Sequence, residues 1–288
     1  MTALRKDLIR EIKNSKNRFL SIAILIALAV AFLSGLKATA PDMKNTDDEY
    51  LDKQQLMDIQ VLSTLGLTKG DIKALGAQNN IERAVGAYCI DAWAGDLVAK
   101  AYSITDGMNL LTVTSGRMPE SPDECIVDKN LLEKMKISVG DSITIDPSDD
   151  YEDCLTHKNF TIVGTAVSPY YISVERGSAS IGSGNVRAYV YLPEGAFDLD
   201  YYTVAYAKVK GAQELTAFTD EYDDYIDDVM DSLKDFGDRR AKLRYDDIID
   251  EAQGKIDDAQ KELDDKEKEA DEKLSDAEQE LKDARRKL

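Results

Sequence analysis

The side chains that could take part in a reaction are few and far apart. His157 is the only histidine, so a Ser-His-Asp arrangement would have to be built on it. Its neighbours Asp153 and Thr156 belong to no nucleophile motif. The chain also lacks a G-x-x-x-x-G-K-[ST] loop, the pattern that holds the phosphates of nucleotides. We therefore expect no enzyme, and no catalytic, cofactor-binding or metal-binding residue.

Two loops have compositions that invite a binding role. The glycine-rich segment 177–184 lacks the lysine and the strand-to-helix setting of a phosphate loop, which favours a mobile surface loop. The other loop could bind Ca²⁺, but it lacks the sixth-position glycine and the closing glutamate of a calcium loop. A solvated acidic turn is the favoured interpretation of its carboxylates, which are Asp146, Asp149, Asp150, Glu152 and Asp153.

The three cysteines, Cys89, Cys125 and Cys154, are odd in number and widely spaced. No metal-binding pattern arises from them, and at most one disulfide could form. Three buried free thiols are the favoured state.

An apolar run dominates the amino-terminal part of the chain. Phe19 to Leu36 read FLSIAILIALAVAFLSGL, eighteen residues without a charge. As a helix this run is roughly 27 Å long, close to the thickness of a hydrocarbon core of about 30 Å. We predict a single transmembrane helix at 19–40, and the lipid bilayer as its partner.

The charges beside this run predict its orientation. Residues 1–37 carry seven basic and two acidic side chains, whereas an acidic stretch follows from Asp42 to Asp52. Basic flanks stay on the cytoplasmic side, so segment 1–18 should be cytoplasmic and residues 41–288 extracytoplasmic, at the cell membrane. Leu4, Leu8, Ile9 and Ile12 fit one face of an amphipathic helix on anionic lipid, although a solvated basic lead-in fits too.

A cleavable signal peptide is the rival interpretation. A basic region, an apolar region and Ala38-Thr39-Ala40 follow one another in the required order. The run is longer than the roughly 15 residues usual for a signal, however, and Pro41 would directly follow the cleaved bond. A retained anchor is favoured.

The net charge argues against nucleic acid as a partner. The whole chain carries −19, and residues 1–37 carry +5, so the remainder carries −24. Such a surface repels phosphate backbones.

The region 41–236 predicts a mixed, mainly antiparallel α+β domain. It should start as β-α-β, with Asp58–Ser63 as a strand, a helix at Asp71–Leu75 capped by Thr68, and one strand at Ile81–Trp93. A further helix is expected at Lys129–Met135. Later strands are expected at Lys100–Thr105, Cys125–Val127, Ser142–Ile145, Asn159–Val167, Ala188–Leu192 and Thr203–Val209, with turns at Ser115-Gly116, Met118-Pro119, Val139-Gly140-Asp141 and Gly182-Ser-Gly184.

An amphipathic helix should close this domain at 212–236. Its apolar stripe could suggest a ligand groove, but packing against the sheet is the favoured role. The stripe consists of Phe218, Tyr222, Tyr225, Ile226, Val229 and Leu233.

Residues 238–288 predict a long coiled-coil helix. Large residues alternate with alanine along the heptad seam, which requires close approach of a partner helix, and the seam shifts phase near Lys266. Because the seam still runs at Leu288, we expect the coiled coil to continue beyond it or to pair with another polypeptide. Leu263, Leu274 and Leu281 are candidate partner contacts, although they could pack only on a return helix. The seam comprises Ile249, Ala252, Ile256, Ala259, Leu263, Ala270, Leu274, Ala277, Leu281, Ala284 and Leu288.

The order of these pieces resembles the start of FtsX-like (MacB-type) ABC transporter permeases. Gly116-Arg-Met-Pro119, Asp123–Asp128, Leu131-Leu132 and Ile137–Thr144 look like the "G-R-x-P … E-ϕ-ϕ … G-D-x-ϕ" series of that family's core domain, where ϕ is apolar. Phe160–Gly164 and Ser168-Pro-Tyr170 are similar to the strand and turn that follow. The resemblance covers about residues 1–235.

This resemblance implies a permease subunit that relays motion from a separate ATPase subunit to an extracytoplasmic domain, which handles cargo or partner proteins. It also implies a homo- or hetero-oligomer. Family members have at least four transmembrane helices, whereas this chain has one. Two alternatives remain: a single-span surface protein that binds a protein or peptide partner through its coiled coil, and a secreted enzyme released by cleavage.

Overall fold

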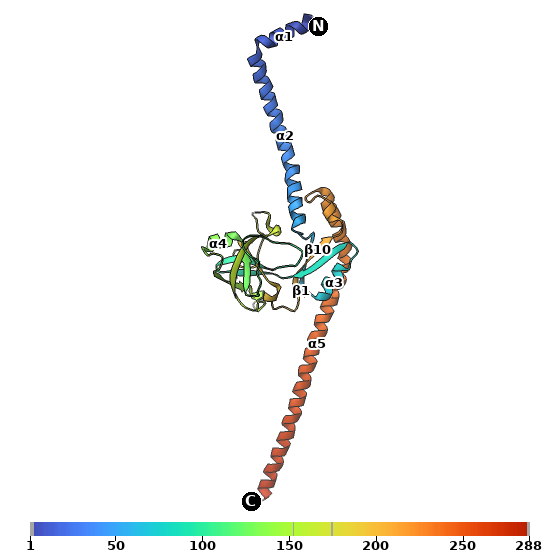
Figure 1. Cartoon of the computed structure of the whole chain (residues 1–288). Helices are drawn as coiled ribbons and strands as arrows, with labels where there is room; N and C mark the ends of the chain where they lie inside the picture. Colours follow the sequence, from blue (N-terminus) through green and yellow to red (C-terminus); the bar gives the residue numbers. More distant parts are fainter. Residues whose placement is uncertain (1–2, 152, 174, 287–288) are drawn as a thin grey trace.

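The computed structural model describes residues 3–151, 153–173 and 175–286, and Figure 1 shows them as two long helices on opposite sides of a strand-rich domain. The helices are α1 (Ala3–Asn14), α2 (Lys16–Lys53), α3 (Lys69–Gly76), α4 (Lys129–Met135) and α5 (Asp220–Arg286). Short 3₁₀ turns lie at Asp149–Tyr151, Pro169–Tyr171, Glu194–Ala196 and Ala212–Glu214. The strands are β1 (Ile59–Leu67), β2 (Ile81–Ala87), β3 (Cys89–Ala94), β4 (Leu97–Ser103), β5 (Thr112–Gly116), β6 (Glu124–Val127), β7 (Ser142–Pro147), β8 (Asn159–Val167), β9 (Ala188–Leu192) and β10 (Tyr202–Val209).

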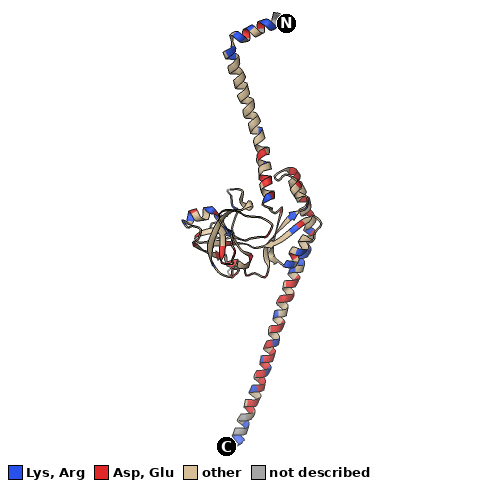
Figure 2. Cartoon of the chain, viewed as in Figure 1, with Lys and Arg blue, Asp and Glu red and all other residues tan. Residues whose placement is uncertain are grey.

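The apolar run forms the first half of α2, which is long and apolar enough to cross a membrane. The helix continues through Pro41 to Lys53, well beyond the apolar residues. Its second half therefore carries acidic side chains toward the strand-rich domain (Figure 2). The short helix α1 lies at an angle to α2 (Figure 1). The predicted apolar face of α1 cannot be described, because the side chains of Leu4, Leu8 and Ile12 lie outside the described ones.

Most strands belong to a closed barrel. The larger sheet has the order β5-β8-β6-β9-β4-β3-β7, and an additional β7–β8 pairing closes six of its strands on themselves. The β4–β9 and β6–β8 pairs are parallel and the others antiparallel, which confirms the predicted mixed α+β class. The barrel interior is filled by alternate side chains of each strand, including Ile90, Ala101, Val127, Phe160 and Val190.

A smaller sheet, with the order β1-β10-β2, lies beside the barrel. Strands β1 and β2 both pair antiparallel with β10, and α3 connects them, as the β-α-β prediction requires. The single strand predicted at Ile81–Trp93 is wrong, because the chain breaks at Tyr88 and enters the barrel as β3. The backbone N–H of Tyr88 donates to the hydroxyl of Ser103, which fixes this crossing between the two sheets.

The local capping signals agree with the structure. Thr68 and Asp71 form a capping box at the start of α3, and Asp128 caps α4, whose bounds match the prediction. Strand β5 was not predicted, because Ser115-Gly116 indicated only a turn. All of its residues are exposed, so its sequence carries no apolar alternation.

The helix predicted at 212–236 begins only at Asp220, after the 3₁₀ turn Ala212–Glu214, and it continues without a break into the helix predicted from 238, so the two form one helix, α5. Its first part packs Tyr222, Ile226 and Val229 against the small sheet, which confirms the predicted core role of the stripe. Phe218 is the exception, since it precedes the helix, has φ of 63° and is exposed.

Beyond the domain, α5 projects away from α2 (Figure 1). Its seam residues Leu263 and Leu274 are 59% and 62% exposed, so none of the described chain covers them. Leu288, and the side chain of Ala284, lie outside the described residues.

Candidate functional site: the junction between α2, the barrel and α5

The candidate site is the place where α2 enters the strand-rich domain. The helix ends in a Schellman-type cap, in which the N–H of Leu56 donates to the carbonyl of Leu51 at 3.0 Å and that of Gln55 to Asp52 at 3.0 Å. This cap requires a left-handed residue, and Gln55 has φ of 50°. Its side-chain amide donates to the carbonyl of Asp52 at 2.7 Å, which holds Gln55 in this conformation.

A loop beside the barrel is bonded directly to this helix end. The N–H of Asn109 donates to the carbonyl of Gln55 at 2.9 Å, and that of Leu110 to the carbonyl of Gln54 at 2.8 Å. In return, the side-chain oxygen of Asn109 accepts from the N–H of Met57 at 2.9 Å. Several hydrogen bonds therefore join the end of α2 to the loop that follows β4.

A second set of contacts joins α2 to the start of α5. The carboxylate of Asp48 accepts from the N–H of Ala217 at 2.7 Å, and the ammonium group of Lys44 donates to the carbonyl of Phe218. Leu51, on the same side of α2, is buried. Although the side chain of Phe218 is exposed, its backbone therefore contacts α2 directly.

A buried carboxylate, Asp58, connects the small sheet to α5. One oxygen of Asp58 accepts from Lys208 at 3.1 Å and from the hydroxyl of Tyr222 at 2.9 Å, and the other accepts from the N–H of Val209 at 2.7 Å. Lys208 also donates to the carbonyl of Leu56 at 2.9 Å. Since Asp58 precedes β1, Lys208 lies on β10 and Tyr222 on α5, the carboxylate holds these three parts of the chain together.

The side chains of this network are largely shielded from solvent. The side chains of Asp58 and Lys208 are only 4% and 9% exposed. Burial, followed by the nearby charge of Asp58, raises the pKa of Tyr222. Burial and the repulsion of Asp48 likewise raise the pKa of Asp52. Charges in such surroundings interact strongly, and an unpaired one is costly.

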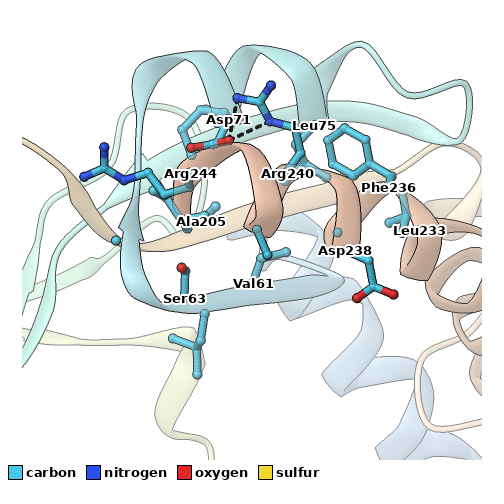
Figure 3. A pocket seen from close by; sticks show the side chains of 16 residues that line it. Val61, Ser63, Asp71, Leu75, Ala205, Leu233, Phe236, Asp238, Arg240 and Arg244 are labelled. Atoms are coloured by element: carbon cyan, nitrogen blue, oxygen red, sulfur yellow. Dashed lines mark hydrogen bonds and ion pairs between the residues drawn. The ribbon is translucent and has the colours of Figure 1, made fainter. Parts of the chain in front are cut away.

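Further along, α5 is fastened to α3 and β1. One carboxylate oxygen of Asp71 accepts from Arg240 at 2.7 Å, while the other accepts from the N–H of Thr68 at 2.8 Å (Figure 3). Burial alone would raise the pKa of Asp71, but the hydrogen bonds from Thr68 and Arg240 lower it. Arg244 donates to the carbonyl of Leu65 at 3.3 Å. The first 25 or so residues of α5 are thereby fixed to the domain.

The residues considered for chemistry lie elsewhere. His157 contacts Thr156 and lies against Phe160 in a tilted arrangement, with ring centroids 4.7 Å apart. In the acidic loop, Asp146 pairs with Lys158, and Glu152 lies outside the described residues. The described residues contain no group of three or more metal-binding side chains.

The glycine-rich loop is attached to the barrel, since the N–H and hydroxyl of Ser180 both donate to Asp91. All three cysteines are free thiols; Cys125 and Cys154 are buried and Cys89 is half-buried.

Sequence reasoning missed the residues of the junction. Asn109 and Lys208 stand far from α2 and α5 in the sequence, and no local pattern pairs them with Gln55 or Asp58. The one available signal was Lys208 itself, a charge within the otherwise apolar strand TVAYAKV. A charge within a buried strand requires a buried partner.

The geometry defines an α+β domain joined by direct hydrogen bonds to a helix that is long and apolar enough to cross a membrane. A family model described as the MacB-like periplasmic core domain matches residues 20–225. The match covers most of the chain, and the chain therefore belongs to the MacB-like periplasmic core domain family of ABC transporter permeases. This family implies an ATPase partner and a place in the cell membrane.

Two solved structures are similar in part. The extracellular domain of the noncanonical ABC-type transporter YknZ from Gram-positive bacteria is 16% identical, with a TM-score of 0.33, and the alignment covers 53% of this chain and 78% of that one. The periplasmic region of MacB from Actinobacillus actinomycetemcomitans is 11% identical, with a TM-score of 0.33, covering 60% and 75%. None of the curated proteins compared with this chain matches it significantly.

Proposed function

We propose that the chain is the amino-terminal part of a permease subunit that carries ATPase-driven motion across the membrane to the strand-rich domain. The main support is that α2 is one helix from Lys16 to Lys53. Its end is joined by hydrogen bonds to the barrel loop and to the start of α5. No flexible linker intervenes, so a tilt or shift of α2 moves the whole domain.

The orientation belongs to this proposal. In this proposal the basic segment before α2 lies in the cytoplasm, beside the ATPase, and residues 41–288 lie on the extracytoplasmic side of the membrane. Two exposed serines, Ser15 and Ser275, allow a conservative test by replacement with cysteine. In a background with Cys89→Ser, a membrane-impermeant maleimide should label Ser275→Cys in intact cells, and it should label Ser15→Cys only after lysis. The opposite pattern would contradict the orientation.

Association with the ATPase is tested separately. The chain, in nanodiscs, is mixed with a candidate ATPase subunit, and binding is measured with and without ATP. Because Ser15 and Ser275 belong to one rigid unit, spin labels at Ser15→Cys and Ser275→Cys should keep their separation, whereas the distance from a label at Ser275→Cys to spin-labelled lipid headgroups should change when ATP is added. An unchanged distance to the headgroups in a complex that hydrolyses ATP would refute the relay.

A single-span surface protein is a second candidate, favoured by the exposed seam of α5. The alternation of leucine or isoleucine with alanine suits an antiparallel helix whose large residues face the alanines. A partner that protects Leu263 and Leu274 in the absence of any ATPase association would support this candidate instead.

A further inference from the structure

A groove lies between β1 and α5, on the part of the domain from which α5 projects (Figure 3). We call it the β1–α5 groove; its volume is about 270 Å³. It is mostly apolar, with a few polar groups at its ends, which is the usual composition of a binding site. The apolar residues that line it include Val61, Leu62, Leu67, Ile72, Leu233 and Phe236.

The groove adjoins the free edge of a sheet. β1 pairs only with β10, so its outer edge is unpaired by any described strand. Leu62, on this strand, is 70% exposed. An apolar edge strand offers backbone donors and acceptors to a further strand, and extended peptides bind proteins in this way.

A glycine of α5 leaves space in the groove. Gly237 lies in the interior of a helix, where glycine costs about 1 kcal/mol relative to alanine. A Cβ atom at Gly237 would meet nothing within 4 Å, so packing within the described chain does not require glycine there. Gly66, on the opposite wall, differs, because a Cβ there would collide with Tyr201.

The two arginines of the groove differ in whether a carboxylate neutralises them. Arg240 is neutralised by Asp71. Arg244 donates through Nε to the carbonyl of Leu65, and within the described chain its two terminal nitrogens have no acceptor. Asp238 lies at the other end of the groove, about 9 Å away along the helix. A carboxylate therefore complements the Arg244 end.

We propose that the β1–α5 groove binds an extended apolar segment of an extracytoplasmic partner protein, which adds as a strand to β1. An apolar side chain of that segment occupies the space beside Gly237, and an acidic residue of it pairs with Arg244. The inference rests on the proposed function, which supplies the extracytoplasmic location.

The test uses the full chain in detergent micelles and short fluorescent peptides as probes, with binding followed by anisotropy. The probe is fluorescein-Ser-Val-Phe-Val-Glu-amide. One control peptide carries Lys in place of Glu, and a second carries Pro in place of the first Val, which removes a strand donor. The acidic peptide should bind about tenfold more tightly than either control.

Matched variants locate the binding. Gly237→Leu fills the space and should abolish binding of the acidic peptide, whereas Gly254→Leu, on the same helix and equally open, should leave binding unchanged. Arg244→Ala should weaken binding about tenfold, and Lys242→Ala, which does not line the groove, should have no effect. Circular dichroism verifies that each variant is folded.

Three outcomes would overturn the proposal: equal binding of all peptides, unchanged binding by Gly237→Leu, or competition by polyphosphate that identifies a polyanion site. None of these binding measurements requires the ATPase. Failure of peptide binding together with intact ATPase association would therefore refute the groove alone, and the permease proposal would stand.

Discussion

Asp58, just before β1, and Lys208 of β10 form a buried ion pair of 3.1 Å at the start of the small sheet, a few residues after the end of α2. The pair is completed by Tyr222 of α5 and by the backbone of Leu56 and Val209. Burying two charges is expensive, and the cost is offset only when every remaining donor and acceptor is satisfied. The pair therefore stabilises one relative placement of α2, the small sheet and α5.

Replacement of Lys208 by Met should destabilise the domain by about 3–5 kcal/mol, because it leaves the Asp58 carboxylate buried without its counter-charge. Chemical denaturation followed by tryptophan fluorescence measures this change. The double variant Lys208→Met, Asp58→Asn should recover part of the loss. If both single and double variants were as stable as the parent, the pair would have no role in the junction.

Replacement of Asn109 by Ala should loosen the end of α2. The N–H of Met57 loses its acceptor, which costs about 1–3 kcal/mol, and alanine tolerates the left-handed conformation at Asn109 poorly. Hydrogen exchange at residues 50–57 should become faster. Asn109→Gly separates the two effects, since glycine accepts the conformation but cannot bond Met57. Unaltered exchange in both variants would show that the loop does not hold the helix.

Acid should destabilise the domain below about pH 4. Burial opposes ionisation of Asp71 and Asp91, but hydrogen bonds from Thr68 and Arg240, and from Lys100 and Ser180, lower their pKa values below the ordinary 3.8. The unfolded chain therefore binds more protons in this range, so stability is complete above about pH 5 and falls as pH passes through the native pKa values. Denaturation midpoints across pH 2–7 measure this, and Asp71→Asn should reduce the slope.

The thiols of Cys125 and Cys154 should resist alkylation in the native state. Burial raises their pKa values to about 12 and about 11, so almost no thiolate exists at neutral pH. A maleimide should label at most Cys89 before denaturation and all three cysteines afterwards, as counted by mass spectrometry. Rapid native labelling of Cys125 would indicate that the barrel opens.

The elements that local patterns encode were predictable, and the contacts between them were not. The apolar run, the Thr68 cap and the alternation in β8 each signal their structure within a few residues. The break at Tyr88 carries no such signal, because β2 and β3 are both strands and only their partners differ. The junction depends on pairs such as Asn109 with Gln55, which tertiary folding brings together across more than fifty residues.

The rigid attachment of α5 also determines how far its far end moves. The portion beyond residue 238 extends about 70 Å as a helix. Because α2, the domain and α5 form one unit, a tilt of that unit by about 5° would displace the far tip by about 6 Å relative to the start of the projecting portion, so the projecting helix acts as a lever arm. A displacement too small to matter along α2 would thus become an excursion as large as a whole helical turn at the far end of α5.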